Sequence, residues 1–96
     1  MSLNKVIHES TRLKIMMILS SVKEVDFNFL LNTLRLTKGN LSSHMSSLEK
    51  NELVNIQKQF LGKLPVTKYS ITEYGKNQLD LYWIEMENIK NMKFSK

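Results

Sequence analysis

Residues 37–50 of the chain read TKGNLSSHMSSLEK. Gly39 indicates a turn, because glycine tolerates backbone angles that other residues avoid, and Asn40 can cap a helix that follows the turn. Three apolar residues then share one helix face, because they recur at spacings of four and three: Leu41, Met45 and Leu48. The other positions are small or polar. The stretch therefore predicts a helix over residues 40–51 with one buried stripe and a serine-rich outer face.

Two further helices are expected before this turn. Asp26 is placed to cap a helix that ends near Leu34. The apolar residues of that helix recur at i, i+3, i+4 and i+7: Phe27, Leu30, Leu31 and Leu34. An earlier helix is expected from about Thr11 to Ser21, with Ser10 or Thr11 as its cap. It is apolar around nearly its whole circumference, which is typical of a helix buried in a core.

After residue 52 the periodicity changes from helical to alternating. Residues 53–60 alternate apolar and polar side chains, residues 62–65 (GKLP) form a turn, and residues 66–71 resume the alternation. This pattern predicts an antiparallel hairpin with an exposed tip. Phe60 and Leu64 stand near that tip, and we expect them to pack under the hairpin rather than to insert between bases.

A last helix is expected from Glu73 to about Lys90, with Thr72 as its cap. Five of its apolar residues form one stripe at helical spacing: Leu79, Tyr82, Trp83, Met86 and Ile89. One small domain cannot cover so much apolar surface on a terminal helix, and such a surplus is typical of an interface. We therefore expect residues 73–92 to form a dimerisation helix in a homodimer. Packing of the stripe within one protomer is the alternative.

Composition excludes several classes of function. The chain has 96 residues, 42% of them hydrophobic and 24% charged, which predicts one globular domain over residues 1–96. With no cysteine and two distant histidines, it is not expected to hold disulfides or zinc. No run approaches the roughly 18 apolar residues of a membrane span, and no secretory leader stands out, so a cytoplasmic protein is expected. The acidic residues form no catalytic pair and no phosphate-binding glycine loop occurs. We expect neither enzyme activity nor a cofactor.

The positive charge is concentrated in one region. The net charge is +5, and a basic balance alone fits nucleic acid, an anionic membrane surface or an acidic protein. Residues 56–70 carry three lysines and no acid, whereas residues 73–87 carry four acids and one lysine. The three lysines of the first segment are Lys58, Lys63 and Lys68. Their clustering on the predicted hairpin favours contacts with phosphates.

The order of these elements predicts the fold class. Two helices joined by a tight turn and followed by a hairpin indicate an α+β winged helix-turn-helix, with a three-helix core, a β-hairpin wing and a long C-terminal helix. The major groove of B-DNA, about 12 Å wide, admits one α-helix. We expect helix 40–51 to lie in that groove of double-stranded DNA. The wing, residues 58–68, would contact the backbone or the adjacent minor groove.

Residues 40–49 resemble the recognition helix of ArsR/MarR-type winged-helix regulators. The usual form there is a small or polar residue, an apolar one, Ser, a variable residue, His, Leu, two variable residues, Leu and Glu. Residues 68–75 (KYSITEYG) resemble the family's second wing strand and its threonine-capped helix, and residues 8–15 (HESTRLKI) resemble the entry to its first core helix. The resemblance implies a minimal DNA-binding module with one dimerising helix, acting as a transcriptional regulator, and we expect a repressor.

The chain departs from the family in three ways. Glu52 stands where the family has a glycine in the left-handed conformation, so we expect Asn51 to take that conformation and the helix to end one residue earlier. The cysteine ligands of metal-sensing members are absent. The long additional helices of drug-sensing members are absent too. Neither thiolate metal sensing nor a drug pocket of that kind is expected.

These arguments select the candidate site residues. The residues expected to contact DNA are Thr37, Lys38, Asn40, Ser42, Ser43, His44, Ser46, Ser47, Lys58, Lys63 and Lys68. Serines both donate and accept hydrogen bonds, so they are expected to give little single-base specificity. His44 has two interpretations: a contact to a phosphate, as the resemblance implies, or a structural histidine near the apolar face.

A rival hypothesis comes from a different class of protein. A winged helix can serve as a protein-interaction or assembly module without DNA binding, although such modules tend to lack a basic wing and a small polar recognition face. RNA binding is a weaker third hypothesis, because no group of aromatic residues lies on one strand face. The operator, the regulated genes, the sign of regulation and any effector ligand stay open.

Overall fold

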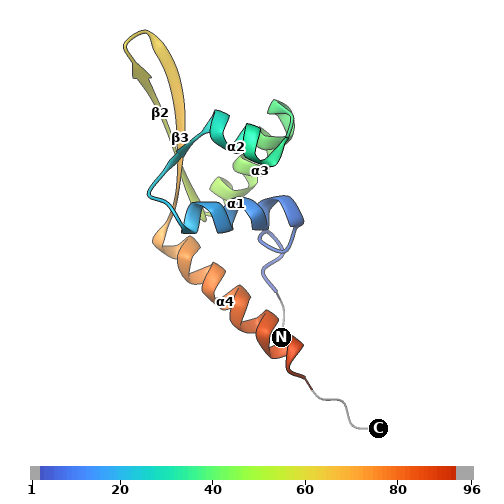
Figure 1. Cartoon of the computed structure of the whole chain (residues 1–96). Helices are drawn as coiled ribbons and strands as arrows, with labels where there is room; N and C mark the ends of the chain where they lie inside the picture. The colour runs from blue at the N-terminus through green and yellow to red at the C-terminus, as the bar shows by residue number, and fades with distance from the viewer. Residues whose placement is uncertain (1–2, 93–96) are drawn as a thin grey trace.

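The computed structural model of the chain describes residues 3–92 (Figure 1). Its elements are α1 (Ser10–Ser20), β1 (Val25–Asp26), α2 (Phe27–Leu34), α3 (Lys38–Lys50), β2 (Val54–Leu61), β3 (Leu64–Ile71) and α4 (Glu73–Lys90). Three helices gather around one core, a hairpin rises from one end of it, and α4 extends from the other end (Figure 1). This is the predicted α+β winged helix-turn-helix. Among the described residues, no helix is long and apolar enough to span a membrane.

The core forms where the apolar stripes of α1, α2 and α3 meet. The predicted stripe of α3 is almost completely buried, with exposed fractions of at most 1% for Leu41, Met45 and Leu48. The inner face of α1 is fully buried as well: Ile15, Met16 and Leu19. Burying a large aliphatic side chain contributes roughly 1.5–3 kcal/mol. These stripes therefore hold α3 against the body and leave its opposite face to solvent.

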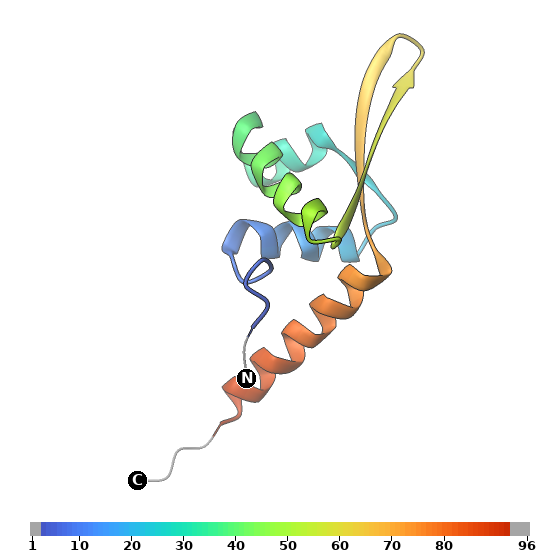
Figure 2. The same ribbon diagram turned by 180° about the vertical axis from the view of Figure 1, so that it is seen from behind.

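The three strands form one antiparallel sheet in the order β1-β3-β2. The hairpin is paired over its whole length, from Val54 opposite Ile71 to Leu61 opposite Leu64. The turn is only Gly62–Lys63, shorter than the predicted turn over residues 62–65. Gly62 has φ +64° and Lys63 does not share the positive angle, as in a type II′ turn. The strands therefore continue beyond the helices to the tip (Figure 2).

The N-terminal caps of α1, α2 and α4 can be compared with the caps predicted from the sequence. The predicted caps Asp26 and Thr72 are confirmed, since their side chains accept hydrogen bonds from backbone N–H groups of α2 and α4. The predicted cap of α1 is wrong. Glu9, rather than Ser10 or Thr11, accepts from the backbone N–H of Arg12 at 2.8 Å. That hydrogen bond lowers the pKa of Glu9, although burial acts in the opposite sense.

The turn between α2 and α3 does not depend on Gly39. Arg35 takes the left-handed conformation there, with φ 54°, and its N–H bonds the carbonyl of Leu31. Thr37 then caps α3, because its hydroxyl accepts from Asn40 N–H at 3.1 Å. The helix begins at Lys38, so the predicted start at residue 40 and the predicted turn role of Gly39 are both wrong. Gly39 lies inside the first turn of α3.

The end of α3 also differs from the prediction. Asn51 has φ −93°, and Glu52 itself adopts the left-handed conformation, with φ 62°. The expected transfer of this role to Asn51 is therefore wrong. A left-handed conformation at a non-glycine residue costs roughly 1–2 kcal/mol. It is held here because the next N–H, that of Leu53, bonds the carbonyl of Leu48 at 3.0 Å.

A junction at Leu53 joins α3, the wing and α4. The carbonyl of Leu53 accepts from Thr72 N–H at 3.1 Å, and the hydroxyl of Thr72 donates to the carbonyl of Glu52 at 2.7 Å. That hydroxyl also accepts from Gly75 N–H at 2.7 Å. Gly75 is buried, and a Cβ at this position would overlap the carbonyl oxygen of Leu53. We call this set, Glu52, Leu53, Thr72 and Gly75, the wing junction.

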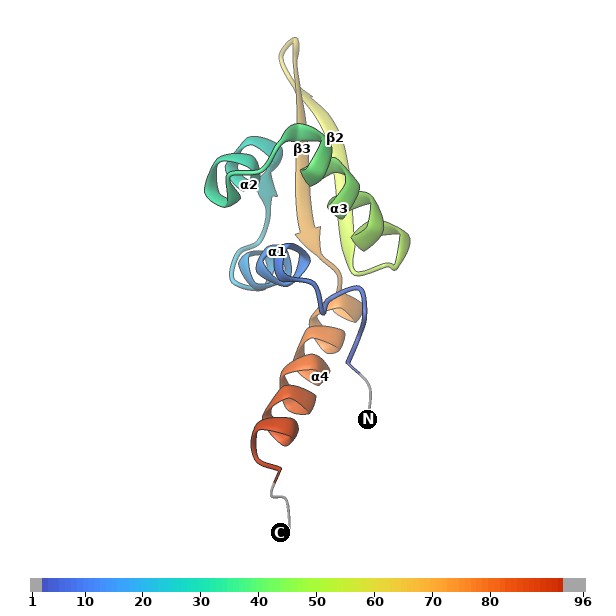
Figure 3. The ribbon, with the colours of Figure 1, turned by 90° about the vertical axis from the view of Figure 1, so that its right-hand side faces the viewer.

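The elongated shape follows from the two projecting elements. The chain measures 65 × 26 × 21 Å, with the wing tip at one end and the end of α4 at the other (Figure 3). The first half of α4 packs on the core through Leu79 and Tyr82, which are 4% and 2% exposed. The second half runs on past α1 with little of the protomer beside it (Figure 3).

We predict opposite effects for alanine at two glycines. Gly75→Ala should lower the free energy of unfolding by about 1–3 kcal/mol, because the added Cβ must displace backbone at the wing junction. Gly39→Ala is the matched control. Its Cβ meets nothing within 4 Å, and alanine should raise the helix stability by about 0.5–1 kcal/mol. Urea denaturation followed by circular dichroism measures both. Equal stability of the two variants would contradict the close approach at Gly75.

Candidate nucleic-acid interface

The outer face of α3 is open to solvent. Most of the α3 residues predicted to contact DNA are exposed: Thr37, Lys38, Asn40, Ser42, Ser43 and Ser46. Ser47 is half-buried on the flank of the helix. The apolar stripe on the opposite side holds the helix down, so these short side chains project outward together.

The wing stands beside this face and turns one of its own faces toward it. Ile56 pairs with Tyr69 and Lys58 pairs with Thr67, so all four side chains lie on the same face of the hairpin. A hollow of about 610 Å³ lies between α3 and this face. Its polar and charged lining comes from both elements: Ser42, Ser46, Glu49, Lys58, Thr67 and Tyr69. The structure therefore brings together residues of the predicted recognition helix and a predicted wing lysine.

Glu49 is a site residue that the sequence argument missed. Its carboxylate lines the hollow opposite Lys58, in the region predicted to face phosphates. Burial raises the pKa of Tyr69 to about 12, and the negative charge of Glu49 acts in the same direction. Tyr69 is therefore a neutral hydrogen-bond donor at any physiological pH. Glu49 lies seven positions after Ser42 and three after Ser46, a spacing that places all three on one face of α3 and could have signalled this position.

Lys68 does not belong to the wing-tip cluster. Successive residues of a strand point to opposite faces, so Lys68 points away from the face that carries Thr67 and Lys58. Its ammonium lies 3.6 Å from a carboxylate oxygen of Glu24. The prediction of three lysines grouped on the tip without an acid is therefore wrong for Lys68. Lys63 stands in the turn itself and is exposed, and no ion pair involves it within residues 3–92.

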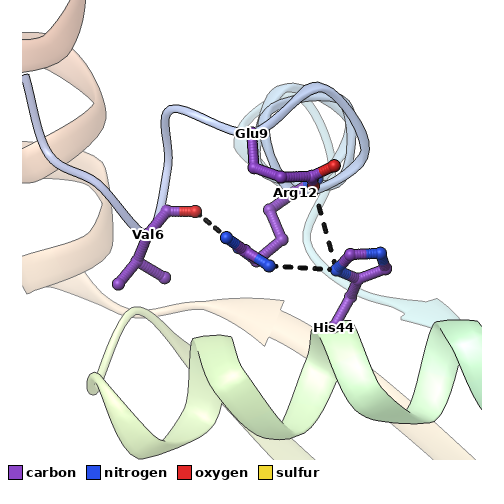
Figure 4. A network of polar contacts seen from close by, with 4 residues as sticks. All are labelled: Val6, Glu9, Arg12 and His44. Atoms are coloured by element: carbon purple, nitrogen blue, oxygen red, sulfur yellow. Dashed lines mark hydrogen bonds and ion pairs between the residues drawn. The ribbon is translucent and has the colours of Figure 1, made fainter.

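His44 faces the body rather than the outer surface of α3. Its Nδ1 lies 3.2 Å from Nη1 of Arg12 and 3.8 Å from Oε1 of Glu9, both from the N-terminal end of α1 (Figure 4). Arg12 is itself held, because its Nε donates to the carbonyl of Val6 at 2.6 Å. A neutral imidazole can accept from Arg12 at Nδ1. These contacts tie α3 to α1 and leave His44 apart from the exposed serines.

The tip of the wing is apolar and uncovered. Phe60 is 71% exposed, and Leu61 and Leu64 are each 63% exposed. The expectation that Phe60 and Leu64 pack under the hairpin is wrong. The two-residue turn extends the strands past the helices (Figure 2). On one face the start of α2 borders Leu61 and Leu64 only across an open hollow, so these side chains stay exposed.

The apolar residues of α4 divide between core and surface. Leu79 and Tyr82 are buried in the protomer, and the Tyr82 hydroxyl is hydrogen bonded to Nδ1 of His8 at 2.8 Å. Their assignment to a dimer interface is therefore wrong, because they already cover the N-terminal segment and α1. Met86 is half-buried, and Trp83 and Ile89 are 40% and 44% exposed. Two more exposed apolar residues of α4 lie outside the predicted stripe, on other faces of the helix: Leu81 and Ile84.

The grouping of ionisable side chains and the lining of the hollow bear on the kind of ligand that this region can contact. Within residues 3–92, no three histidine or acidic side chains are grouped so as to hold a metal ion. The hollow beside α3 is open, and its lining combines hydroxyls, one lysine and one carboxylate with the apolar side chains of Phe27, Met45 and Ile56. Such a surface is suited to contacts with a large polar ligand.

Comparison with known proteins gives consistent matches. A family model described as the winged helix DNA-binding domain matches residues 11–90. The uncharacterized protein MJ0432 of Methanocaldococcus jannaschii is 30% identical over 82 residues, which cover 85% of this chain and 89% of that protein.

Two solved structures share the fold. The transcriptional regulator homologue protein from Pyrococcus horikoshii OT3 superposes with a TM-score of 0.84 at 28% identity, covering 92% of this chain and 87% of that one. A protein assigned to the MarR family of transcriptional regulators, from Enterococcus faecalis V583, superposes with a TM-score of 0.71 at 23% identity, covering 90% of this chain and 82% of that one. At that identity the second match shows the fold alone.

Proposed function

The chain belongs to the winged helix DNA-binding domain family, and from that premise we propose that it is a sequence-specific regulator of transcription that binds double-stranded DNA as a dimer. The observation that supports this proposal most is the hollow between α3 and the wing, which we call the shared hollow. The outer face of α3 and the Lys58 face of the wing border one open space, so a single duplex can contact both. The proposal treats residues 1–96 as one DNA-binding unit.

In this proposal α3 occupies the major groove. Its exposed polar side chains reach base edges, while the buried stripe keeps the helix on the body. Asn40 is the residue best suited to direct readout, because an amide can bond adenine N6 and N7 together. The serines donate and accept equally, so they support docking more than base choice. Glu49 adds discrimination, since a carboxylate accepts from cytosine N4 and repels phosphate.

The lysines of the proposal contact the phosphate backbone. Lys38, Lys58 and Lys63 are exposed, and Lys58 points into the shared hollow. A lysine is a point charge without the planar fork of arginine, so these residues supply affinity rather than sequence choice. His44 acts in this proposal as a positioning residue. Its contacts with Arg12 and Glu9 fix α3 relative to α1 instead of reaching DNA.

Dimerisation in the proposal uses the exposed apolar surface of α4. Its large exposed hydrophobic residues include Leu81, Trp83, Ile84 and Ile89, with exposed fractions between 40% and 55%. The second half of the helix has little of its own protomer beside it (Figure 3). Two copies joined there would present two α3 helices to successive major grooves, about 34–36 Å apart on a pseudo-palindromic site. Occlusion of a promoter by such a dimer would make the protein a repressor.

The wing lysines should differ in their effect on salt dependence. Lys58→Ala and Lys63→Ala should each reduce the slope of log K against log salt by about 0.9, because each removes one phosphate contact. Lys68→Ala is the matched control. Its ammonium is paired with Glu24 on the opposite face, so the slope should stay as in the wild type. The measurement is a titration of fluorescent duplex at several salt concentrations. Three unchanged slopes would rule out the wing as a DNA contact.

Acidic substitutions on α4 should dissociate the dimer. Trp83→Asp and Ile89→Asp place a charge in the proposed interface, and burying an unpaired carboxylate there is strongly unfavourable. Sedimentation equilibrium should report monomers for both. Lys76→Asp introduces the same side chain at an exposed polar position of the same helix and should leave the dimer intact. A wild-type monomer, or dimers in all variants, would contradict this interface.

A further inference from the structure

Among residues 3–92, the large apolar side chains with the highest exposed fractions lie at the wing tip. Phe60 is 71% exposed and Leu61 and Leu64 are 63% exposed, whereas the next highest value among the large hydrophobic residues is 55%, for Ile84. Isolated exposed apolar residues are normal on a soluble protein. Three such residues gather at the end of a projecting hairpin, on both of its faces, and exposed apolar surface of this kind is typical of sites that are covered by a ligand or partner.

The tip is apolar on both of its faces. Phe60 pairs with Pro65, and both follow Lys58 and Thr67 on the face that borders the hollow. Leu61 pairs with Leu64, and these two lie on the opposite face beside the turn. The hairpin therefore ends in a narrow wedge with apolar side chains on either side, rather than in a flat sheet surface.

The charge around the wedge suits a polyanion. Residues 53–72 contain no aspartate or glutamate. Lys58 and Lys63 flank the apolar residues and are exposed. On the opposite face Asp26 lines a hollow with Leu61 and Leu64, so the positive side of the tip is the Lys58 face. An acidic partner surface is the electrostatic complement of that face, and the wedge is continuous with the α3 surface through it.

The length of wing beyond the core is comparable with half of a DNA helical turn. Ile56 is the last residue of β2 that is partly buried against the core, and Leu61 lies five residues further along the strand. At about 3.4 Å per residue, the tip stands roughly 17 Å beyond the core. The step from one groove to the next is half of a helical turn of about 34 Å, which is also roughly 17 Å.

From these observations we infer that Phe60, with Leu61 and Leu64 beside it, enters the minor groove next to the α3 site and wedges into a base step, so that the protein bends its DNA. This inference rests on the proposed function and adds a second mode of recognition to it. Apolar side chains inserted in this way partly unstack a step and bend the duplex by roughly 20–90° toward the major groove. Lys58 and Lys63 hold the backbone on either side of the wedge.

The wedge supplies a selectivity that the serines of α3 lack. Pyrimidine–purine steps such as TA and CA unstack most easily, so bound sites should carry one of them where the tip enters. This preference lies about half a turn from the bases that α3 reads. It is a readout of DNA deformability, and it needs no hydrogen bond from the tip.

The test measures bending and binding on the same duplex. The probe is a duplex of about 30 base pairs, selected by the wild-type protein from a random pool and labelled at both ends for energy transfer. The wild type should shorten the end-to-end distance. A variant with Phe60→Ser, Leu61→Ser and Leu64→Ser should bind at least about tenfold more weakly, keep the wild-type salt slope and leave the duplex straight.

Two further variants separate the wedge from general damage to the wing. Gln59→Ala changes an exposed polar neighbour on the same strand and should leave both affinity and bend unchanged. Phe60→Leu keeps an apolar wedge and should retain most of the bend. Circular dichroism confirms that each variant is folded, as expected for substitutions at exposed positions.

The remaining outcomes overturn the inference in distinguishable ways. An unbent duplex with the wild type, or an equal bend with the triple variant, overturns the wedge and leaves DNA binding standing. Failure of the wild type to bind any duplex overturns the proposed function together with the wedge. If the triple variant sediments as a smaller species than the wild type without DNA, the tip joins copies of the chain and the wedge is wrong.

Discussion

The close packing of Gly75 on the carbonyl of Leu53 is the constraint on which the rest of the structure depends. At this point the end of α3, the first residues of β2 and the start of α4 share a small set of hydrogen bonds, with the Thr72 hydroxyl bonded on both sides. Because no side chain fits between the two backbones, the three elements have one relative placement. The wing then rises beside α3 at a fixed distance, and the hollow between them is a consequence of this junction.

The α3 helix, which carries the proposed DNA-contacting residues, is held at two points along its length. The wing junction fixes its C-terminal end, and the contacts of His44 with Arg12 and Glu9 fix its middle against α1 (Figure 4). None of the exposed serines of α3 takes part in either set of contacts. In the proposed function, this helix offers a surface of short polar side chains to DNA, and the proposed wedge adds selectivity through deformability of the duplex.

The sequence predicted the fold where the signal is local. The spacing of Leu41, Met45 and Leu48 predicted the buried face of α3, and the caps Asp26 and Thr72 predicted two helix starts. The sequence-based prediction failed where a side chain contacts a residue that is distant in the chain. Nothing near Lys68 shows that Glu24 lies beside it, and the alternation of strand faces alone would have separated Lys68 from Lys58. The left-handed Glu52 departs from residue preference because the junction imposes it.

The same limit applies to α4. The helical spacing of its apolar residues is visible in the sequence, but which of them meet the core depends on where α1 and the N-terminal segment lie.

Comparing amide spectra of the labelled protein with and without duplex is the most direct test that α3 and the wing form one DNA-binding face. The account predicts shifts concentrated in residues 38–50 and 58–66. Shifts confined to only one of these segments, or centred on residues 81–90 of α4, would contradict it.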